Sequence, residues 1–159
     1  MVEQIGADSK GYTMIKITET MRSLLNDNPG PGPICVVGTA ALHDGYPQLS
    51  PKGSLIAYND ECLAFWERSG RSTARLIQEN PRITVYYRNK ERGSDLFPAG
   101  VLRFYGDVEI LPAGPDSDRI WSMIPEHERK PNPEKKGMAV LIRLNRVEDL
   151  NGTILMRRD

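Results

Sequence analysis

Residues 49–81 read LSPKGSLIAYNDECLAFWERSGRSTARLIQENP and contain the most informative pattern in the chain. A Lys-Gly turn precedes two apolar, strand-like runs, which lead into a helix that starts with arginine and hydroxyl side chains. The start of a helix presents unpaired backbone N–H groups and the positive end of the helix dipole, so it attracts phosphate. Arg71, Ser72 and Thr73 stand at that start, and Lys52 belongs to the preceding turn. The stretch therefore predicts a socket for one small phosphorylated ligand.

The basic residues of this stretch have two interpretations. Arg68, Arg71 and Arg75 are spaced by three and four residues, so they could form an ordinary solvated helix face. Glycine, serine and threonine residues interleave with them, however. Glycine lets the backbone approach a ligand closely, and hydroxyl and guanidinium groups bind phosphate oxygens. The phosphate interpretation is therefore favoured over the solvated face.

Pro51 and Gly53 interrupt a stretch with an otherwise regular strand pattern. Because such residues remove hydrogen bonds between strands, their presence here calls for an explanation. One reason is a simple bulge in an edge strand. The other is that backbone N–H groups between Ser50 and Ser54 point into a ligand site, where Lys52 meets an anion. A flavin ring needs donors near N5 and O4 and acceptors near N3, which irregular backbone supplies. Both explanations stay open, and the second makes flavin mononucleotide (FMN) the predicted ligand.

Two aromatic pairs could face such a ring. Phe65-Trp66 precedes the arginine-rich segment, and Phe104-Tyr105 lies in a later strand-like run. Most aromatic residues of this kind belong to the core. Because successive residues of a strand point to opposite faces, one member of each pair points outward. An isoalloxazine ring could stack there, and the sequence does not say on which residue.

Composition excludes several classes of protein. The 159 residues are enough for one ordinary domain. The 21 basic and 21 acidic residues give zero net charge, so the general basic footprint of a nucleic-acid-binding protein is absent. No signal peptide is evident and no apolar run approaches the roughly 18 residues of a membrane span, so we expect a cytoplasmic protein without a membrane partner. Cys35 and Cys62 lie in apolar runs and predict buried thiols, with a disulfide as the less favoured alternative.

The chain as a whole is predicted to be mainly β with short helices. We expect residues 1–12 to be a flexible segment and residues 13–159 to form a single domain. Apolar spacing and turn residues predict the elements that follow. Helices are expected at residues 15–25, with Thr18 or Thr20 near the start, at 72–79 and at 116–123. Strands are expected at residues 34–42, 46–58, 62–66, 83–88, 101–111, 138–144 and 153–156.

Two details refine this organisation. Gly106 lies inside a long predicted strand and indicates a bulge or a sharp bend. Residues 126–136 are highly charged and contain two prolines, which predicts a surface loop. Helices do not alternate regularly with strands, so the pattern favours a six- to seven-stranded small β-barrel over a doubly wound α/β sheet.

Signals for other chemistries are weak. His43 and His127 each stand without a second metal ligand at a characteristic spacing, so no metal site is predicted. Glu61, Glu67 and Glu79 are scattered and do not mark a catalytic carboxylate pair. Neither a Walker A motif nor a Rossmann glycine fingerprint is present. We therefore predict no catalytic side chain, and any reaction would depend on a cofactor.

The order of these motifs resembles the pyridoxamine 5′-phosphate oxidase-like family of FMN-binding split β-barrels. The resemblance extends from about residue 18 to residue 111. Its landmarks are Val37-Gly38-Thr39-Ala40, Gln48-Leu49-Ser50-Pro51-Lys52-Gly53-Ser54, Leu63-Ala64-Phe65-Trp66, Arg71-Ser72-Thr73 followed by Asn80-Pro81, and Leu102-Arg103-Phe104-Tyr105-Gly106.

The resemblance implies a homodimer with two FMN sites at the subunit interface. On this basis Lys52, Arg71, Ser72 and Thr73 would hold the phosphate. The ribityl chain and the ring would be bordered by Ser50, Gly53, Ser54 and the strand at Phe65-Trp66. Residues of the partner would complete each site, with Trp121 and the loop after Pro125 as candidates.

The departures from the family concern the substrate. True pyridoxamine phosphate oxidases carry Ser-Arg-Lys where this chain has Arg71-Ser72-Thr73, and they end in an Arg-Leu-x-Pro motif that residues 155–159 lack. The resemblance therefore implies an FMN-dependent oxidoreductase that acts on an unknown small-molecule substrate and is not a true pyridoxamine phosphate oxidase. The alternatives are a non-catalytic module of the same fold that binds flavin or haem, and an interaction dimer without cofactor.

Overall fold

A computed structural model describes residues 13–27, 34–43, 45–68, 72–89 and 100–159 of the chain. The expected flexible segment, residues 1–12, lies outside this range. The helices in the described residues are α1 (Glu19–Asn26), α2 (Ser72–Glu79), α4 (Pro115–Met123) and α5 (Glu126–Arg129). The strands are β1 (Ile34–Ala40), β2 (Pro47–Pro51), β3 (Ile56–Ala57), β4 (Cys62–Glu67), β5 (Arg82–Arg88), β6 (Val101–Leu111), β7 (Met138–Glu148) and β8 (Ile154–Arg157).

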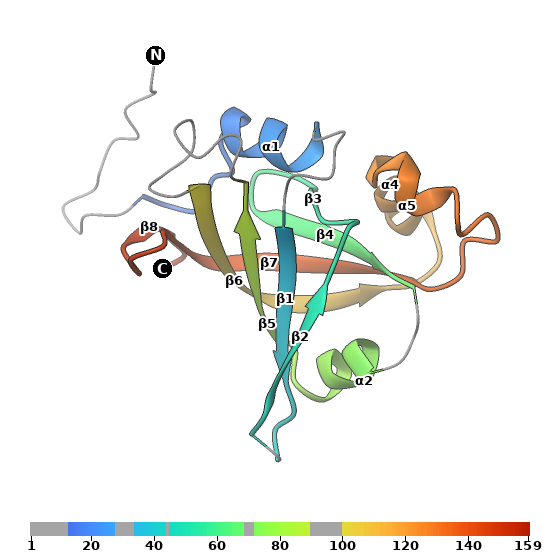
Figure 1. The fold of residues 1–159 in the computed structure, drawn as a ribbon, viewed down its shortest axis with the longest axis horizontal. Helices are drawn as coiled ribbons and strands as arrows, with labels where there is room; N and C mark the ends of the chain where they lie inside the picture. Colours follow the sequence, from blue (N-terminus) through green and yellow to red (C-terminus); the bar gives the residue numbers. More distant parts are fainter. Residues whose placement is uncertain (1–12, 28–33, 44, 69–71, 90–99) are drawn as a thin grey trace.

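These strands form one curled antiparallel sheet (Figure 1). Its order is β2-β1-β5-β6-β7-β4-β3, and β8 pairs with β7 beside this path. The predicted fold class, a mainly β split barrel with short helices, is confirmed. The described residues contain eight strands rather than six or seven, because the chain between Pro47 and Ala57 divides into β2 and the two-residue β3. The division falls where Lys52 and Gly53 interrupt the strand pattern.

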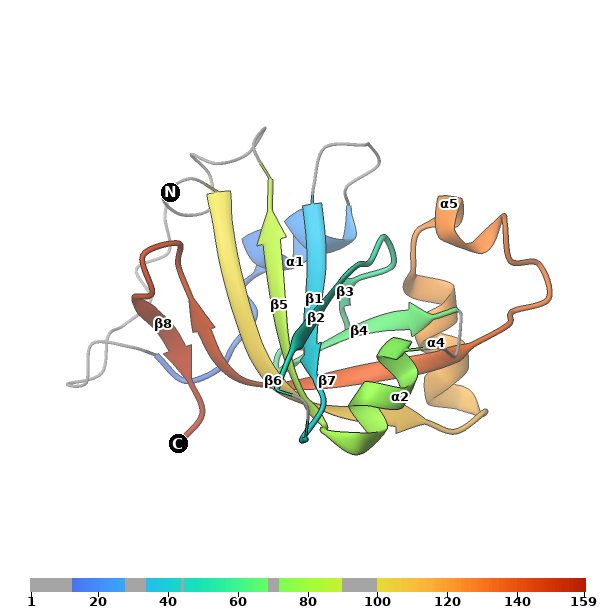
Figure 2. The same cartoon turned by 60° about the horizontal axis from the view of Figure 1, so that its bottom comes forward.

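Two apolar clusters hold the barrel together. The larger one fills the inside of the curl and includes Phe65 and Phe104, neither of which is exposed to solvent. The smaller one lies on the other face of β4, where Trp66 packs with Ile120 and Ile124. Figure 2 shows α4 beside this strand. All six residues of β4 are buried because both faces of this strand are covered. The side chains of this strand are therefore held by packing on both of its faces.

Helix α1 begins later than the apolar spacing predicts. Thr18 caps it by accepting a hydrogen bond from Met21 N at 3.2 Å, as expected for a threonine at a helix start. Residues 15–17 are not helical because Ile17 N donates to Asp60 O at 2.7 Å instead. The buried face of the helix packs onto the core through Met21, Leu24 and Leu25.

The two predicted irregularities have different outcomes. The β6–β7 register shifts between Tyr105 and Gly106, which confirms the predicted bulge. The prediction of a loop throughout residues 126–136 is wrong at its start, where α5 forms after Pro125. Glu126 and Glu128 in the first turn, with Arg129 in the last, suit the helix dipole. None of the described helices is long and apolar enough to span a membrane.

Candidate functional site

A small polar cluster lies where β2 meets the start of α2. Ser50 Oγ and Thr73 Oγ1 are 3.2 Å apart. Gln48 Nε2 donates to Ser50 Oγ at 3.1 Å and to Thr73 Oγ1 at 3.3 Å. We call Gln48, Ser50 and Thr73 the hydroxyl–amide cluster. It brings two of the predicted site residues together although they are 23 positions apart in the chain.

Gln48 had no place in the site predicted from the sequence. It lies two residues before Ser50 on the same strand, so both side chains point to the same face of β2. That spacing was the signal that could have found it. Thr73 is buried and Ser72 is exposed, so of the two hydroxyl residues at the start of α2 the second one faces β2.

The position of α2 is fixed by its buried face and by its C-terminal end. Thr73, Ala74, Leu76 and Ile77 form its buried face. The helix stops before Asn80-Pro81, as the sequence predicts, because the residue before proline resists the helical conformation. Asn80 Nδ2 then donates to Ala40 O at 3.0 Å and ties the end of the helix to β1. The start of α2 is thereby held over β2.

Lys52 is paired with a buried carboxylate. Its Nζ lies 2.6 Å from Glu67 Oε2 and 5.4 Å from the centre of the Phe65 ring. The side chain of Lys52 is 13% exposed and that of Glu67 is 2% exposed. The sequence predicts that Lys52 meets a ligand anion and gives no sign that Glu67, one of several scattered carboxylates, is its partner. The fold instead neutralises Lys52 with Glu67.

The rest of the turn is fixed by β1, β4 and α5. Lys52 N donates to Cys35 O at 3.0 Å. Ser54 Oγ accepts from Trp66 N at 3.0 Å and donates to Trp66 O at 3.3 Å, so this hydroxyl joins the turn to β4. A Cβ on Gly53 would overlap the carboxylate of Glu128 from α5. Glycine at this position therefore lets α5 approach the turn closely.

Neither ring of the Phe65-Trp66 pair is open to a ligand in this chain. Phe65 is fully buried in the larger core cluster. Trp66 points to the opposite face, where it packs edge-on against Trp121 with ring centres 4.9 Å apart, and its Nε1 donates to Lys136 O at 2.8 Å. Trp121, expected near a partner's site, thus packs within its own chain. Arg71 lies outside the described residues.

The second aromatic pair divides differently. Phe104 points into the core, and Tyr105 is half-buried on the outer face of the sheet. Its hydroxyl donates to Glu148 Oε2 at 3.0 Å, and Arg146 stacks 4.2 Å from its ring centre. Burial, and next the hydrogen bond to Glu148, raise the pKa of Tyr105.

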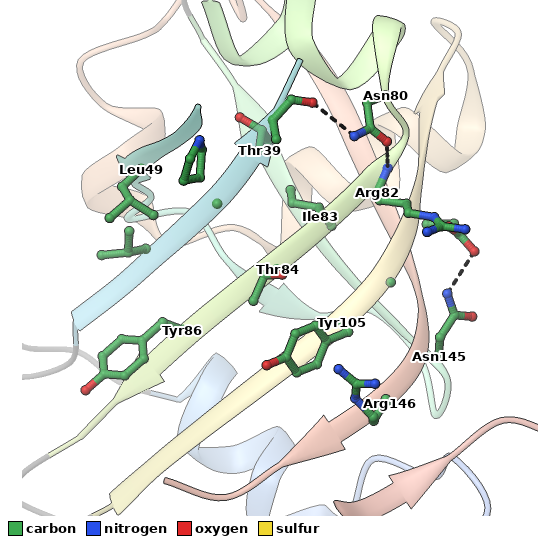
Figure 3. A pocket seen from close by; sticks show the side chains of 16 residues that line it. Thr39, Leu49, Asn80, Arg82, Ile83, Thr84, Tyr86, Tyr105, Asn145 and Arg146 are labelled. Atoms are coloured by element: carbon green, nitrogen blue, oxygen red, sulfur yellow. Dashed lines mark hydrogen bonds between the residues drawn. The ribbon is translucent and has the colours of Figure 1, made fainter. Parts of the chain in front are cut away.

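A pocket of about 790 Å³ opens on this outer face (Figure 3). Its floor is the outer side of β1, β5 and β6, with Tyr86 and Tyr105 on neighbouring strands and Leu49 of β2 at one edge. Asn80, Arg82, Asp107, Asn145 and Arg146 form its polar part. The pocket has the size and the mixed lining of a small-molecule site. It contains none of the predicted site residues, because Leu49 and Ser50 point to opposite faces of β2.

Metal and thiol chemistry find little support. No group of three or more His, Cys, Asp or Glu side chains able to hold a metal occurs in the part of the chain that the structure describes. Cys35 and Cys62 are free thiols, as predicted, with Cys62 buried and Cys35 only partly buried by exposed area. Burial raises the pKa of Cys35 to about 12, against the opposing effect of Lys52. This thiol is therefore not a ready nucleophile.

The sequence profile of the pyridoxamine 5′-phosphate oxidase family matches residues 17–149. The chain belongs to this family. The match covers β1 to β7 and includes both the hydroxyl–amide cluster and the Lys52–Glu67 pair. A comparison with curated proteins finds no match.

Solved structures share the fold of this family member. HupZ of Group A Streptococcus is 22% identical, with a TM-score of 0.65 over 87% of this chain and 98% of that one. A putative pyridoxamine 5′-phosphate oxidase of Lactobacillus delbrueckii is 16% identical, with a TM-score of 0.56 over 86% and 96%. An FMN-binding protein of Syntrophomonas wolfei is 14% identical, with a TM-score of 0.60 over 82% and 84%. At these identities the likeness concerns the fold.

The residues of this family member fit a flavin phosphate in part. The hydroxyl–amide cluster supplies neutral hydrogen-bond donors beside the start of α2, the end of a helix at which backbone N–H groups have no partner within the helix. Thr39, opposite Gln48 on β1, has a buried hydroxyl without a hydrogen-bond partner among the described residues. Such an atom is typical of a site completed by a ligand or water. Positive charge is weaker than expected, because Lys52 is already paired.

Proposed function

We propose that this protein binds FMN and acts as a flavin-dependent oxidoreductase on a small substrate. The observation that carries the proposal is the contact of Ser50 and Thr73 at the start of α2, in a chain of this family. Lys52, Gly53 and Ser54 form the adjoining turn. A similar fold in an FMN-binding protein adds support.

Different residues would hold the phosphate, the ribityl chain and the ring of the cofactor. Ser50, Ser72 and Thr73, with Arg71, would hold the phosphate. Lys52-Gly53-Ser54 and the backbone of β4 at Phe65-Trp66 would border the ribityl chain and the ring. Bound FMN supplies hydride or electron transfer at its ring, so no general acid or base is assigned to this chain. The task of the protein is to orient the flavin and to exclude water.

We also propose a homodimer that forms across the outer face of the sheet. Leu42, Tyr46 and Leu49 near the β1–β2 connection are 61%, 81% and 71% exposed, which is high for large apolar side chains. They adjoin the apolar side of the outer pocket. A contiguous exposed apolar surface of this kind is typical of an interaction site. A second copy related by a two-fold axis would cover it and close the pocket.

The first test is an absorption spectrum of the purified protein, followed by titration of the stripped protein with FMN. We expect a flavin spectrum and saturation near one FMN per chain. A Soret band would show that the bound cofactor is haem rather than a flavin. Absence of binding would overturn the cofactor assignment. The oxidoreductase part requires FMN-dependent oxidation of a reduced nicotinamide or another donor, and its absence with all donors would favour a flavin-binding module.

Thr73→Val tests the phosphate position while preserving side-chain volume. We expect FMN affinity to fall by about 1.5–3 kcal/mol, because a hydroxyl bond to a charged phosphate is lost. Affinity for riboflavin, which lacks the phosphate, should change little. The measurement is fluorescence titration with both flavins. Ser122→Ala, which removes an exposed hydroxyl on α4, is the matched control. Equal weakening for FMN and riboflavin would contradict the placement.

Leu49→Glu tests the dimer. A carboxylate at this exposed position would be buried twice in a symmetric interface, once from each copy. We expect the dimer dissociation constant to rise about 30-fold or more, corresponding to about 2 kcal/mol. Sedimentation equilibrium measures the change. Leu150→Glu, in the turn before β8, is the control because Leu150 does not line the outer pocket. A dimer of unchanged affinity would exclude this face.

A further inference from the structure

A buried carboxylate is paired with the lysine of the turn that adjoins the proposed phosphate site. Glu67 Oε2 lies 2.6 Å from Lys52 Nζ, at the turn that leads away from Ser50. With 2% of its side chain exposed, Glu67 is far less accessible than an ordinary surface partner of a lysine. In low-dielectric surroundings a charge acts strongly on its neighbours, so loss of either partner would strongly change the potential at a ligand charge beside the pair.

A second cation beside the turn is paired as well. Arg68 Nη2 lies 3.0 Å from Glu128 Oε2, and the carboxylate of Glu128 lies directly against Gly53. Two described cations at this turn, Lys52 and Arg68, therefore each have a carboxylate partner from the same chain. These two described pairs therefore add no net charge to the turn, whereas a phosphate dianion is bound more strongly where positive charge is in excess.

We propose that Glu67 determines how strongly the site discriminates between phosphorylated and dephosphorylated flavin. It acts through Lys52, whose charge it neutralises, so that among the described residues the hydroxyl and amide donors carry the contact to the ligand. The inference rests on the proposed function, because it concerns the same site. Its consequence is a modest preference for FMN over riboflavin, which lacks the phosphate but keeps the ring and ribityl chain.

An opposite role for Glu67 makes an opposite prediction. If Glu67 instead held Lys52 in the orientation needed to bind phosphate, its removal would weaken FMN binding. A purely structural ion pair would change the affinities for FMN and riboflavin by the same factor. The ratio of the two dissociation constants, riboflavin over FMN, therefore separates the three roles.

A series of four proteins varies the charge at this position. Beside the wild type, Glu67→Gln leaves Lys52 unneutralised, Lys52→Met removes the lysine partner of Glu67, and Lys52→Met combined with Glu67→Leu removes both charges. We expect the preference ratio to rise about tenfold in Glu67→Gln and to fall about tenfold in Lys52→Met. The double variant should keep the wild-type ratio, because its net charge is also zero. Glu61→Gln, which removes an exposed carboxylate at the other end of β4, is the control and should keep the ratio too.

Salt provides a second readout on the same proteins. Raising ionic strength should lower the preference ratio more in Glu67→Gln than in the wild type, because only the variant leaves the charge of Lys52 without its carboxylate partner. Each single variant shifts the ratio in its own direction, so either one tests the inference if the other unfolds. The double variant is the control for folding, since replacing a buried pair by apolar groups of similar volume is well tolerated.

The outcomes separate this inference from the proposed function. Failure of every protein in the series to bind either flavin overturns both. Binding by the wild type, with a ratio that stays constant or falls in Glu67→Gln, overturns the role of Glu67 and leaves the FMN assignment intact. A ratio that differs between the wild type and the double variant also overturns it. FMN binding gained only in Glu67→Gln supports the inference and refutes FMN as the natural cofactor.

Discussion

Lys52→Met is expected to lower the free energy of unfolding by about 3–5 kcal/mol, because it leaves the carboxylate of Glu67 buried without its lysine partner. Taking a charge out of water is expensive, and the ion pair is what offsets that expense in the native fold. Urea denaturation followed by circular dichroism measures the change. The effect is large because Glu67 is almost completely inaccessible, whereas exposed ion pairs contribute about 1 kcal/mol or less.

The double variant Lys52→Met, Glu67→Leu gives the matched comparison. It removes both charges and fills the space with apolar groups, so most of the lost stability should return. The exposed pair Arg75–Glu79 on α2 is the control, and Arg75→Met should change stability by less than about 0.5 kcal/mol. A loss below about 1 kcal/mol in Lys52→Met would show that Glu67 is not held by Lys52 in solution.

Gly106→Ala is expected to lower the free energy of unfolding by about 2–3 kcal/mol. A Cβ at this bulge would overlap the backbone oxygen of Arg143 on β7 and lie 2.7 Å from Ile142 Cγ2. Backbone of the neighbouring strand can move only by disturbing the β6–β7 pairing, which is the longest ladder of the sheet. Thermal unfolding monitored by circular dichroism measures the loss.

Gly38→Ala is the control for this change. A Cβ on Gly38 would meet Leu49 Cδ2 at 3.5 Å, which is ordinary van der Waals contact. Alanine there should be neutral or slightly stabilising, because it restricts the unfolded chain. Similar losses in Gly38→Ala and Gly106→Ala would mean that the close approach at the bulge does not set the cost.

Much of the fold was predictable because local chemistry agrees with it. Thr18 caps α1, Asn80-Pro81 ends α2, and Gly106 marks the bulge in β6, each for a reason that lies within a few residues of chain. The first turn of the predicted helix at residue 15 was wrong because Ile17 pairs with the distant Asp60. The short α5 was missed because charge and proline dominate its composition.

The site was predictable only in outline. Ser50 and Thr73 could be assigned to one site because a phosphate socket needs hydroxyl groups near a helix start, and the structure places them 3.2 Å apart. The roles of Lys52 and Tyr105 could not be predicted. Lys52 finds its partner on β4 and Tyr105 on β7, and such pairings depend on the register of strands distant in sequence.

The sequence by itself determined the mainly β class, the position of its bulge, the helix start beside β2 and the hydroxyl groups that surround it. These properties follow from periodicity, turn chemistry and helix termini, which act over a few residues. The tertiary structure alone decided which cation is neutralised, which aromatic ring faces outward and where the outer pocket opens. Those outcomes depend on how the curled sheet brings β2, β4 and β7 together, because burial turns a distant carboxylate such as Glu67 into the strongest local influence on Lys52.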